Sequence, residues 1–354
     1  MAKEVALPEE LLWLRKALER LDAALLETIA ARLSTVKAIS KAKRGAGLPV
    51  YDENREREAR SNLVEKARSL GLSRELAEKL YAVLVHESRC AQLYCPERLR
   101  VYIYGYGGMA RTIASALARA GCWVAIGGRS EEKARGLAEE LGALAMEPQR
   151  GIDWADMVVY AVPGSAVPGL LEEHLRHARQ SMLFTDLASV KKPLVEKIEQ
   201  VLARTEEPPE YASLHPLFGP IECPAGETVA IIPVRLARWR EKLAQLLHGL
   251  GMKTVTIDPD THDKVMAVNQ VLHHLIHQLY HEASKQLATR LGIDNELVEK
   301  LMTRSLKQTI QVTNRLATLS NVVEEIRREN PYSNEALRAL REVAEKLTAQ
   351  LRES

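Results

Sequence analysis

Val101-Tyr102-Ile103-Tyr104-Gly105-Tyr106-Gly107-Gly108-Met109-Ala110 is the stretch that decides the fold. Its apolar and aromatic start predicts a buried strand, and its glycines lead into a helix-forming stretch that reaches Gly121. After a strand and before a helix, this pattern is typical of a dinucleotide fingerprint, because glycines let backbone approach a pyrophosphate at a helix N-terminus. The alternative is a tight turn without a ligand. We predict cofactor contacts from Gly105, Gly107, Gly108, Met109 and Ala110.

The residues after this stretch predict an α/β domain followed by a helical one. A βαβαβ unit is expected, and later strands follow it. We predict a Rossmann α/β domain over residues 96–258 and an all-α substrate and dimerisation domain over residues 259–354, without a separate strand-rich regulatory module. The predicted strands are 101–104, 123–126, 157–162, 182–186, 211–214, 229–233 and 254–257.

The chain before residue 96 begins with a very long predicted helix. Residues 9–44 lack Gly and Pro and carry an apolar side chain every three or four positions. Gly45, Gly47 and Pro49 predict the end of this helix. Its length of ~54 Å exceeds what a compact monomer can cover, so a partner chain is expected.

Two shorter helices complete this region. Asp52 is the predicted cap of a helix that reaches about Leu70, and Ser73 is the predicted cap of one that reaches about Tyr94. We therefore predict a three-helix, all-α first domain over residues 1–95.

Composition disfavours several classes of protein. Lys and Arg number 49 against 47 Asp and Glu, and this net charge of +2 is too balanced for a nucleic-acid-binding regulator. No apolar run approaches the ~20 residues of a membrane span. Cys90, Cys95, Cys122 and Cys223 form no C-x-x-C pair, and the N-terminus lacks an apolar signal core. These features favour a cytoplasmic protein with reduced thiols.

The end of the second predicted strand bears on the choice of dinucleotide. NAD-preferring sites place Asp or Glu there, whereas this chain has Gly127-Gly128-Arg129-Ser130. Arg129 and Ser130 suit a 2′-phosphate, which favours NADP over NAD. A solvated surface arginine is the alternative interpretation.

Two polar residues follow predicted strands at the carboxyl edge of the sheet, where open α/β folds bind ligands. His215 begins His215-Pro216-Leu217-Phe218-Gly219-Pro220, and a histidine there can accept a hydroxyl proton near neutral pH. Ser189 lies in Asp186-Leu187-Ala188-Ser189-Val190-Lys191. Its hydroxyl is predicted to orient the histidine or a substrate, or to cap the next helix.

Further polar residues lie in the predicted C-terminal helices. Arg315 offers a bidentate fork to a carboxylate, with an intrahelical ion pair as the alternative. His273, His274, His277 and His281 have helical spacings that imitate a zinc site. Because no cysteine or matching carboxylate motif accompanies them, no metal is expected, and one or two are predicted to contact substrate.

Cations on the N-terminal helices form a second candidate site. Arg32 and Lys43 are about three turns apart, so they share a helix face and suit one small dianion. Arg15 lies ~25 Å from Arg32 along the axis and about 100° around it, so it joins them only from a partner chain. Ser88 and Gln92 share a face of the third helix. A charged solvent face is the alternative.

Residues 8–93 resemble the all-helical chorismate mutase family. The resemblance rests on Leu14-Arg15, Ala31-Arg32-Leu33, Lys41-Ala42-Lys43, Val50-x-Asp52-x-x-Arg55-Glu56 and Ser88-x-x-x-Gln92, in this order. Such a site holds a flexible dianion in a compact chair and stabilises charge on the ether oxygen, without acid, base or nucleophile. The resemblance implies that Arg32, Arg55, Ser88 and Arg15 of the partner subunit bind carboxylates, that Lys43 and Gln92 bind the ether oxygen, and that Asp52 and Glu56 contact the hydroxyl.

From Cys95-Pro96 onward the chain resembles prephenate dehydrogenase, as fused behind a chorismate mutase in bifunctional tyrosine-pathway enzymes. The segments around Ser189 and His215 carry the resemblance, together with His262-Asp263, Gln270, His274 and Arg315-Leu316. It implies that His215 takes the ring-hydroxyl proton of prephenate as hydride leaves for nicotinamide. It also implies that Ser189 positions the hydroxyl and His215, that Arg315 binds a carboxylate, and that Gln270 and His274 line the pocket.

Together the two resemblances imply a bifunctional homodimer that makes prephenate from chorismate and oxidises it to 4-hydroxyphenylpyruvate, with NADP or NAD as cofactor. Ile221 stands where some relatives carry an acidic residue, which leaves both prephenate and arogenate open as substrates. In the other open interpretation, the N-terminal helices are a dimerisation module without catalysis, attached to a β-hydroxyacid-type or arogenate dehydrogenase. The full polar set on those helices favours catalysis.

Overall fold

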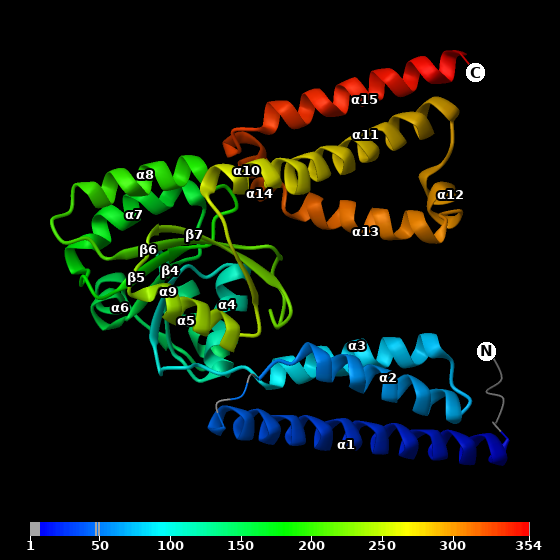
Figure 1. Cartoon of the computed structure of the whole chain (residues 1–354). Helices are drawn as coiled ribbons and strands as arrows, with labels where there is room; N and C mark the ends of the chain where they lie inside the picture. The colour runs from blue at the N-terminus through cyan, green and yellow to red at the C-terminus, as the bar shows by residue number, and fades with distance from the viewer. Residues whose placement is uncertain (1–7, 47, 49, 354) are drawn as a thin grey trace.

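Two helical arms project from the same side of a central α/β domain (Figure 1). This computed structural model describes residues 8–46, 48 and 50–353 of the chain. The first three helices form one arm, and the last helices form the other. Among the described residues, no helix combines the length and apolar character that a membrane span needs.

The N-terminal arm contains the three predicted helices, α1 (Glu9–Gly45), α2 (Glu53–Ser69) and α3 (Arg74–Ala91). Asp52 and Ser73 cap α2 and α3, as predicted, because their side chains accept backbone N–H groups of the first turn. Helix α3 ends three residues before Tyr94, whose N–H bonds to Gly249 of the α/β domain. Gly47 and Pro49, predicted to end α1, lie outside the described residues.

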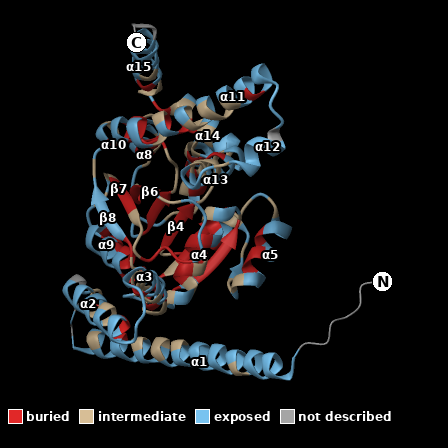
Figure 2. Cartoon of the chain, turned by 90° about the vertical axis from the view of Figure 1, so that its right-hand side faces the viewer, coloured by how far each residue is buried: buried red, intermediate tan, exposed pale blue. Residues whose placement is uncertain are grey.

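The apolar face of α1 is largely uncovered within one chain. Helices α1 and α2 both pack on α3. Nevertheless Leu14, Leu18, Leu21 and Leu25 on α1 are 49, 60, 67 and 56% exposed. Figure 2 shows this exposure along α1, in contrast to the buried strands of the central sheet. The arm therefore lacks a core of its own over the first half of α1.

The central domain is built on an eight-stranded sheet with the order β3-β2-β1-β4-β5-β6-β7-β8. Strands β6 and β7 are antiparallel, and the other neighbours are parallel. The strands are β1 (Arg100–Tyr104), β2 (Trp123–Gly127), β3 (Leu144–Ala145), β4 (Met157–Tyr160), β5 (Leu183–Asp186), β6 (Glu210–Pro216), β7 (Thr228–Arg235) and β8 (Lys253–Thr256).

Helices cover both faces of this sheet, which explains the apolar runs of its strands. They are α4 (Gly108–Ala120), α5 (Glu131–Leu141), α6 (Pro148–Trp154), α7 (Val167–His174), α8 (Lys192–Ala203) and α9 (Trp239–Gly249), with 3-10 turns at Gly164–Ala166 and Leu175–His177. Neither β3 nor α6 was predicted from the sequence, and they are only two and seven residues long. Helices α7 and α9 were not predicted either.

The region after residue 258 is helical, as predicted. A hydrogen bond joins two segments within this arm, because the side-chain amide of Asn330 donates to the Asp263 carbonyl on α10. Glu325 ties the arm to the α/β domain by accepting the Gly164 N–H at 3.0 Å. The elements are α10 (Pro259–Met266), a π-helical turn (Ala267–Leu272), α11 (His273–Leu291), α12 (Asn295–Lys300), α13 (Arg304–Thr318), α14 (Ser320–Glu329) and α15 (Ser333–Glu353).

The prediction of reduced thiols is wrong for this structure. Cys90 is disulfide-bonded to Cys223, and Cys95 to Cys122. The partners are 133 and 27 residues apart in sequence, so their spacing carried no sign that the fold brings them together. The Cys90–Cys223 bond joins the N-terminal arm to the α/β domain.

Candidate active sites

The glycine-rich turn between β1 and α4 leaves open space before a helix N-terminus. Gly105 has φ +142°, and a Cβ there would lie 2.3 Å from the Ala161 carbonyl oxygen, so a larger residue does not fit. A Cβ at Gly107, by contrast, would meet no atom within 4 Å. Gly108 lies against the ring of Pro220 from the β6–β7 loop. This geometry fits the phosphates of a dinucleotide.

A cavity of about 290 Å³ lies between this turn, the loop after β5 and helix α14. Gly107 and Met109 line it from the turn, Ser189 from the loop, and Glu325 from α14. Ser189 is therefore next to the predicted cofactor contacts. Glu325 was not identified from sequence, because a single glutamate on an amphipathic helix gives no signal of a site.

Three buried side chains form a hydrogen-bonded series that ends at His215. Its Nδ1 lies 2.9 Å from Nε2 of His262, and Nδ1 of His262 lies 2.8 Å from Oδ1 of Asp263. The Asp263 carboxylate also accepts the backbone N–H groups of Lys191 and Lys192. Because Asp263 accepts the Nδ1 proton of His262, Nε2 of His262 accepts from His215. Nε2 of His215 then carries the lone pair that can accept a hydrogen bond or a proton.

The surroundings of His215 favour its neutral form. Burial, followed by the charge of Lys191 and by the neighbouring His262 ring, holds the pKa of His215 well below its usual value. The amide nitrogen of Gln270 lies 3.5 Å from Nε2 of His215. Oε1 of Gln270 is buried without a hydrogen-bond partner among the described residues, so a ligand hydroxyl there would satisfy it. The arrangement presents a proton acceptor to a ligand at the sheet edge.

Lys191 joins the ends of β5 and β6 next to His215. Its fully buried ammonium lies 3.0 Å from Asp186, 2.7 Å from Ser213 and 2.8 Å from the Leu214 carbonyl. Burial lowers the pKa of Lys191, and Asp186 opposes this shift. The Asp186–Lys191 segment thus fixes β5 against β6 and positions the loop that carries Ser189.

The C-terminal arm carries two further predicted residues, His274 and Arg315. His274 lies one turn after Gln270, is 8% exposed, and has a pKa lowered to about 4, first by burial and then by its neighbours His273 and Arg327. Arg315 is exposed on α13, where its charge acts on His273. Among the described residues, no hydrogen bond links Arg315 to His215.

A second cavity, of about 510 Å³, lies beyond the end of β2. Arg129 lines it, and so does Arg150 from α6. Two guanidinium groups therefore border the place where a 2′-phosphate is predicted. The Ser130 hydroxyl instead accepts the Lys133 N–H at 3.4 Å and caps α5. Arg150 was not identified from sequence, because helix α6 itself was not predicted.

The polar faces of α1 and α3 meet in the N-terminal arm. Nη1 of Arg32 lies 2.5 Å from Oγ of Ser88 and 3.1 Å from the Leu84 carbonyl. The Lys43 ammonium donates to the Val50 carbonyl at 3.2 Å. Gln92 donates to the Ser88 carbonyl at 3.0 Å, which places it beside the same cluster. The fold thus gathers Arg32, Ser88 and Gln92.

Other predicted residues of this site have protein partners or lie apart. Glu56 is bound by both Nε and Nη2 of Arg89, at 3.0 and 2.5 Å. Arg89 was not singled out from sequence, because nothing distinguishes it from other helical arginines. Arg55 pairs with Glu58 on the surface, and Asp52 serves as the α2 cap. Arg15 is exposed on the first half of α1.

Comparison with protein families assigns both regions. Residues 14–93 match the family model described as chorismate mutase type II, and residues 113–229 match prephenate dehydrogenase, nucleotide-binding domain. The chain therefore combines a chorismate mutase region with a prephenate dehydrogenase region. The N-terminal candidate site lies within the first matched region, and Ser189 and His215 lie within the second.

Individual relatives agree with this assignment. The T-protein of Haemophilus influenzae is 27% identical over 272 residues, which are 74% of this chain and 67% of that protein. A probable arogenate/prephenate dehydrogenase of Methanocaldococcus jannaschii is 27% identical over 177 residues. That match spans 49% of this chain but only 39% of the archaeal protein.

Solved structures show the same dehydrogenase fold. Prephenate dehydrogenase from A. aeolicus, in complex with hydroxyphenyl propionate and NAD+, has a TM-score of 0.56 at 19% identity. It covers 73% of this chain and 96% of its own. Synechocystis arogenate dehydrogenase has a TM-score of 0.52 at 18% identity and covers 72% of this chain and 92% of its own.

Proposed function

We propose that the N-terminal domain rearranges chorismate to prephenate. The rest of the chain then oxidatively decarboxylates prephenate to 4-hydroxyphenylpyruvate, with reduction of a nicotinamide dinucleotide. The observation that carries the dehydrogenase half is the His215–His262–Asp263 chain beside the glycine-rich turn. In the mutase half, the contact between Arg32 and Ser88 supports the proposal, because the fold brings together two side chains that can bind an anion.

In the dehydrogenase half, Nε2 of His215 takes the proton from the ring hydroxyl of prephenate. The glycine-rich turn would hold a nicotinamide dinucleotide, which would supply the acceptor for the hydride. Ser189 positions the hydroxyl, Gln270 and His274 line the pocket, and Arg315 binds a substrate carboxylate. Loss of the ring carboxylate as CO2 makes the ring aromatic, which drives the step in one direction.

In the mutase half, cations hold chorismate in a compact chair. Arg32 and Ser88 bind carboxylates together with Arg55, and the Lys43 ammonium and Gln92 amide stabilise the charge on the ether oxygen. In this structure the Lys43 ammonium and the Gln92 amide donate to backbone carbonyls, and a ligand replaces these hydrogen bonds at little cost in free energy.

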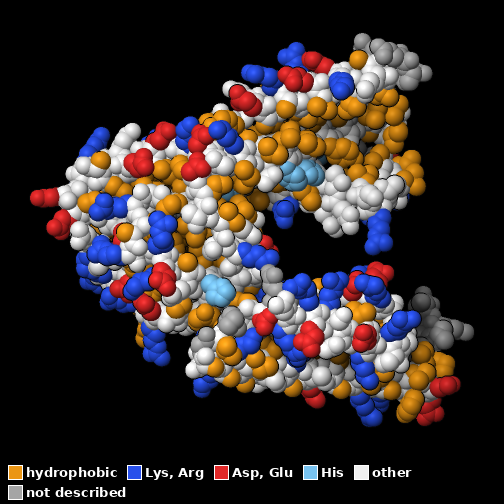
Figure 3. Space-filling view, in the orientation of Figure 1, with side chains coloured by type: hydrophobic (Ala, Val, Ile, Leu, Met, Phe, Trp, Pro, Cys, Tyr) orange, Lys and Arg blue, Asp and Glu red, His pale blue; other side chains and the backbone are white. Residues whose placement is uncertain are grey.

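We also propose a homodimer in which both arms take part. On the C-terminal arm, Ile276, Leu279, Leu287 and Leu291 are 46, 52, 57 and 61% exposed. Figure 3 shows hydrophobic side chains gathered along the middle of this arm, between α15 and α13. Water-exposed apolar faces of this extent favour burial against a second copy. Such a partner also brings its own Arg15 to the Arg32 site.

Rate measurements on the purified chain test the proposed function. We expect the protein to consume chorismate without a cofactor, and to reduce dinucleotide when it is given prephenate. Arogenate in place of prephenate tests the side-chain preference left open by Ile221. Chorismate that stays unchanged would support the alternative of a non-catalytic dimerisation module, whereas dinucleotide that stays oxidised with both acids would contradict the dehydrogenase assignment.

A preference for NADP over NAD is expected to depend on Arg129. Replacing Arg129 with alanine should raise KM for NADP about 10- to 100-fold, because a charge-assisted contact to the 2′-phosphate is lost. KM for NAD should change little. Arg135→Ala is the matched control, because Arg135 pairs with Glu131 on α5 and does not line the cavity. An unchanged ratio of the two KM values would show that Arg129 does not select the cofactor.

A further inference from the structure

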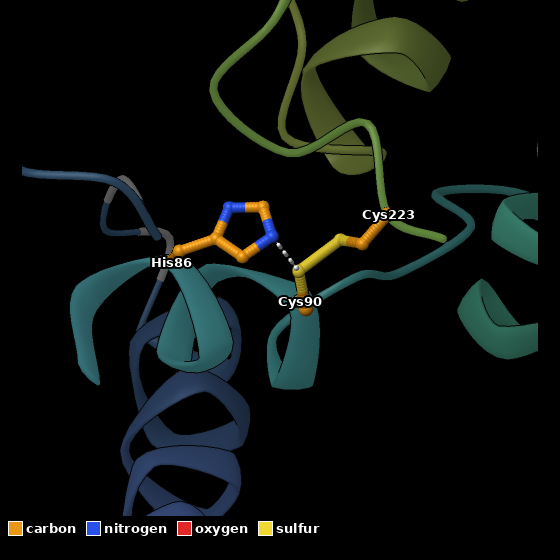
Figure 4. A group of neighbouring side chains, drawn as sticks. All are labelled: His86, Cys90 and Cys223. Atoms are coloured by element: carbon orange, nitrogen blue, oxygen red, sulfur yellow. Dashed lines mark hydrogen bonds between the residues drawn. A yellow bond between two sulfur atoms is a disulfide. The ribbon is translucent and has the colours of Figure 1, made fainter. Parts of the chain in front are cut away.

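The C-terminal end of α3 is covalently fastened to the α/β domain. Cys90 lies in the last turn of α3 and Cys223 in the loop between β6 and β7, and both are 4% exposed (Figure 4). Around this bond, Tyr51 packs edge-on against His248, and the Tyr94 N–H donates to the Gly249 carbonyl. The disulfide therefore lies in the interface between the two domains.

Each half of this disulfide is attached to one candidate site. Cys90 lies between Ser88 and Gln92 on α3. Cys223 follows Ile221, whose backbone N–H and carbonyl both bond to Oγ1 of Thr112 on α4, at 3.0 and 2.7 Å. The same loop places Pro220 against Gly108 of the glycine-rich turn. One covalent bond thus connects the end of α3 to the loop that lies on the cofactor turn.

A histidine lies beside one of the two sulfurs. Nε2 of His86 is 3.6 Å from Sγ of Cys90, one helical turn away, and the His86 side chain is exposed (Figure 4). A ring N–H at this position stabilises a thiolate that forms on Cys90, and thiolate stability decides which sulfur leaves in disulfide exchange. The exposed ring also connects the buried sulfur to solvent protons.

We propose that the Cys90–Cys223 disulfide is a redox-controlled connection that locks the N-terminal arm onto the dehydrogenase domain. A dithiol reductant opens it. Its thiolate bonds to Sγ of Cys223, the S–S bond breaks, and Cys90 leaves as a thiolate that takes a proton through His86. The second thiol of the reductant then displaces Cys223, so the reductant becomes a disulfide and the protein gains two thiols.

The other disulfide provides a matched control. Cys95 and Cys122 join the segment after α3 to the start of β2, and the backbone already holds these segments together through the hydrogen bond from the Cys95 N–H to the Ala120 carbonyl. Opening this bond frees no domain interface. The double variants C90S/C223S and C95S/C122S therefore carry the same number of changes but differ in which connection is lost.

Peptide mapping tests whether the bond forms. Trypsin without reductant should release from C95S/C122S a species in which peptide 90–98 is joined to peptide 205–235. Dithiothreitol added to the folded protein should separate them. Two free peptides before reduction would overturn the proposal, and so would peptides that stay joined until the protein is denatured, because the bond would then be permanent. One zinc per chain on His86, Cys90 and Cys223, which lie close enough to hold a metal, would also overturn it.

Hydrogen exchange tests whether the bond locks the interface. In the wild-type protein and in C95S/C122S, dithiothreitol should increase exchange several-fold in residues 86–92 and 217–227 only. In C90S/C223S these segments should exchange fast without reductant and should not respond to it. Equal exchange in the oxidised and reduced wild-type protein would contradict the lock. The readout requires neither enzyme activity, so its outcome is separate from that of the proposed function.

Discussion

Replacing His215 with asparagine is expected to lower kcat for prephenate oxidation by about 10²- to 10⁴-fold, the usual contribution of a general base. Asparagine retains a donor toward His262 but has no group that takes a proton. Initial rates of dinucleotide reduction measure this loss. Chorismate consumption by the same variant should be unchanged, because the mutase site lies on the N-terminal arm.

The pH dependence of the wild-type rate follows from the environment of His215. Burial and the charge of Lys191 lower its pKa below the usual value of about 6.5, so the neutral base persists below that pH. We therefore expect the acid limb of kcat to begin below pH 6.5. The free energy of unfolding should also fall as the pH falls in this range, because His215 binds a proton more readily in the unfolded chain than in the folded one. His215 thus destabilises the fold as pH falls below 6.5.

We expect His262 to act through His215, as a residue that positions the base. A variant at His262 distinguishes this role from a role in packing alone. His262→Ala is expected to lower kcat by about 10- to 100-fold. It should also move the acid limb upward, because the electrostatic interaction with the His262 ring helps to depress the pKa of His215. A fall in rate with an unmoved pH profile would indicate a packing role only.

For the first variant, His215→Asn, full activity would contradict the assignment of His215 as the base.

Local patterns were sufficient to predict most of the fold. Periodicity and caps placed α1, α2 and the start of α3, and apolar runs between glycines placed seven of the eight strands of the sheet. The exceptions are physical. β3 and α6 are too short to show a period, and α3 ends early because tertiary hydrogen bonds take over the backbone from Tyr94. Helices α7 and α9 were not predicted either.

Contacts between distant segments were beyond prediction from one sequence. The bond of Arg89 to Glu56 and that of Cys90 to Cys223 join segments 33 and 133 residues apart. His262 was visible only as part of a motif, since nothing in its neighbours shows that it reaches His215. Arg315 was predicted as a carboxylate ligand, and its exposed place on α13 leaves that role as a proposal.

Replacing Arg32 with alanine is expected to lower kcat/KM for chorismate by about 10²- to 10³-fold, because one preorganised cation at the substrate is lost. Prephenate oxidation should be spared. The Arg32 guanidinium lies 2.5 Å from Ser88, so the variant also leaves that hydroxyl without its donor. Lys37→Ala is the matched control, since Lys37 is an exposed cation on the same helix. An equal loss in both variants would point to a general effect of charge on α1.

Mixing two inactive variants decides whether Arg15 is supplied by a second chain. In a dimer with interlocked helices, each site combines Arg32 of one chain with the partner's Arg15. Arg15→Ala and Arg32→Ala homodimers should both be inactive as mutases. After subunit exchange, half of the dimers are mixed and each of these has one intact site, so about a quarter of the wild-type activity should return. The exposed apolar face of α1 is what this arrangement buries. If no activity returns although mixed dimers form, the Arg32 site does not use the partner's Arg15.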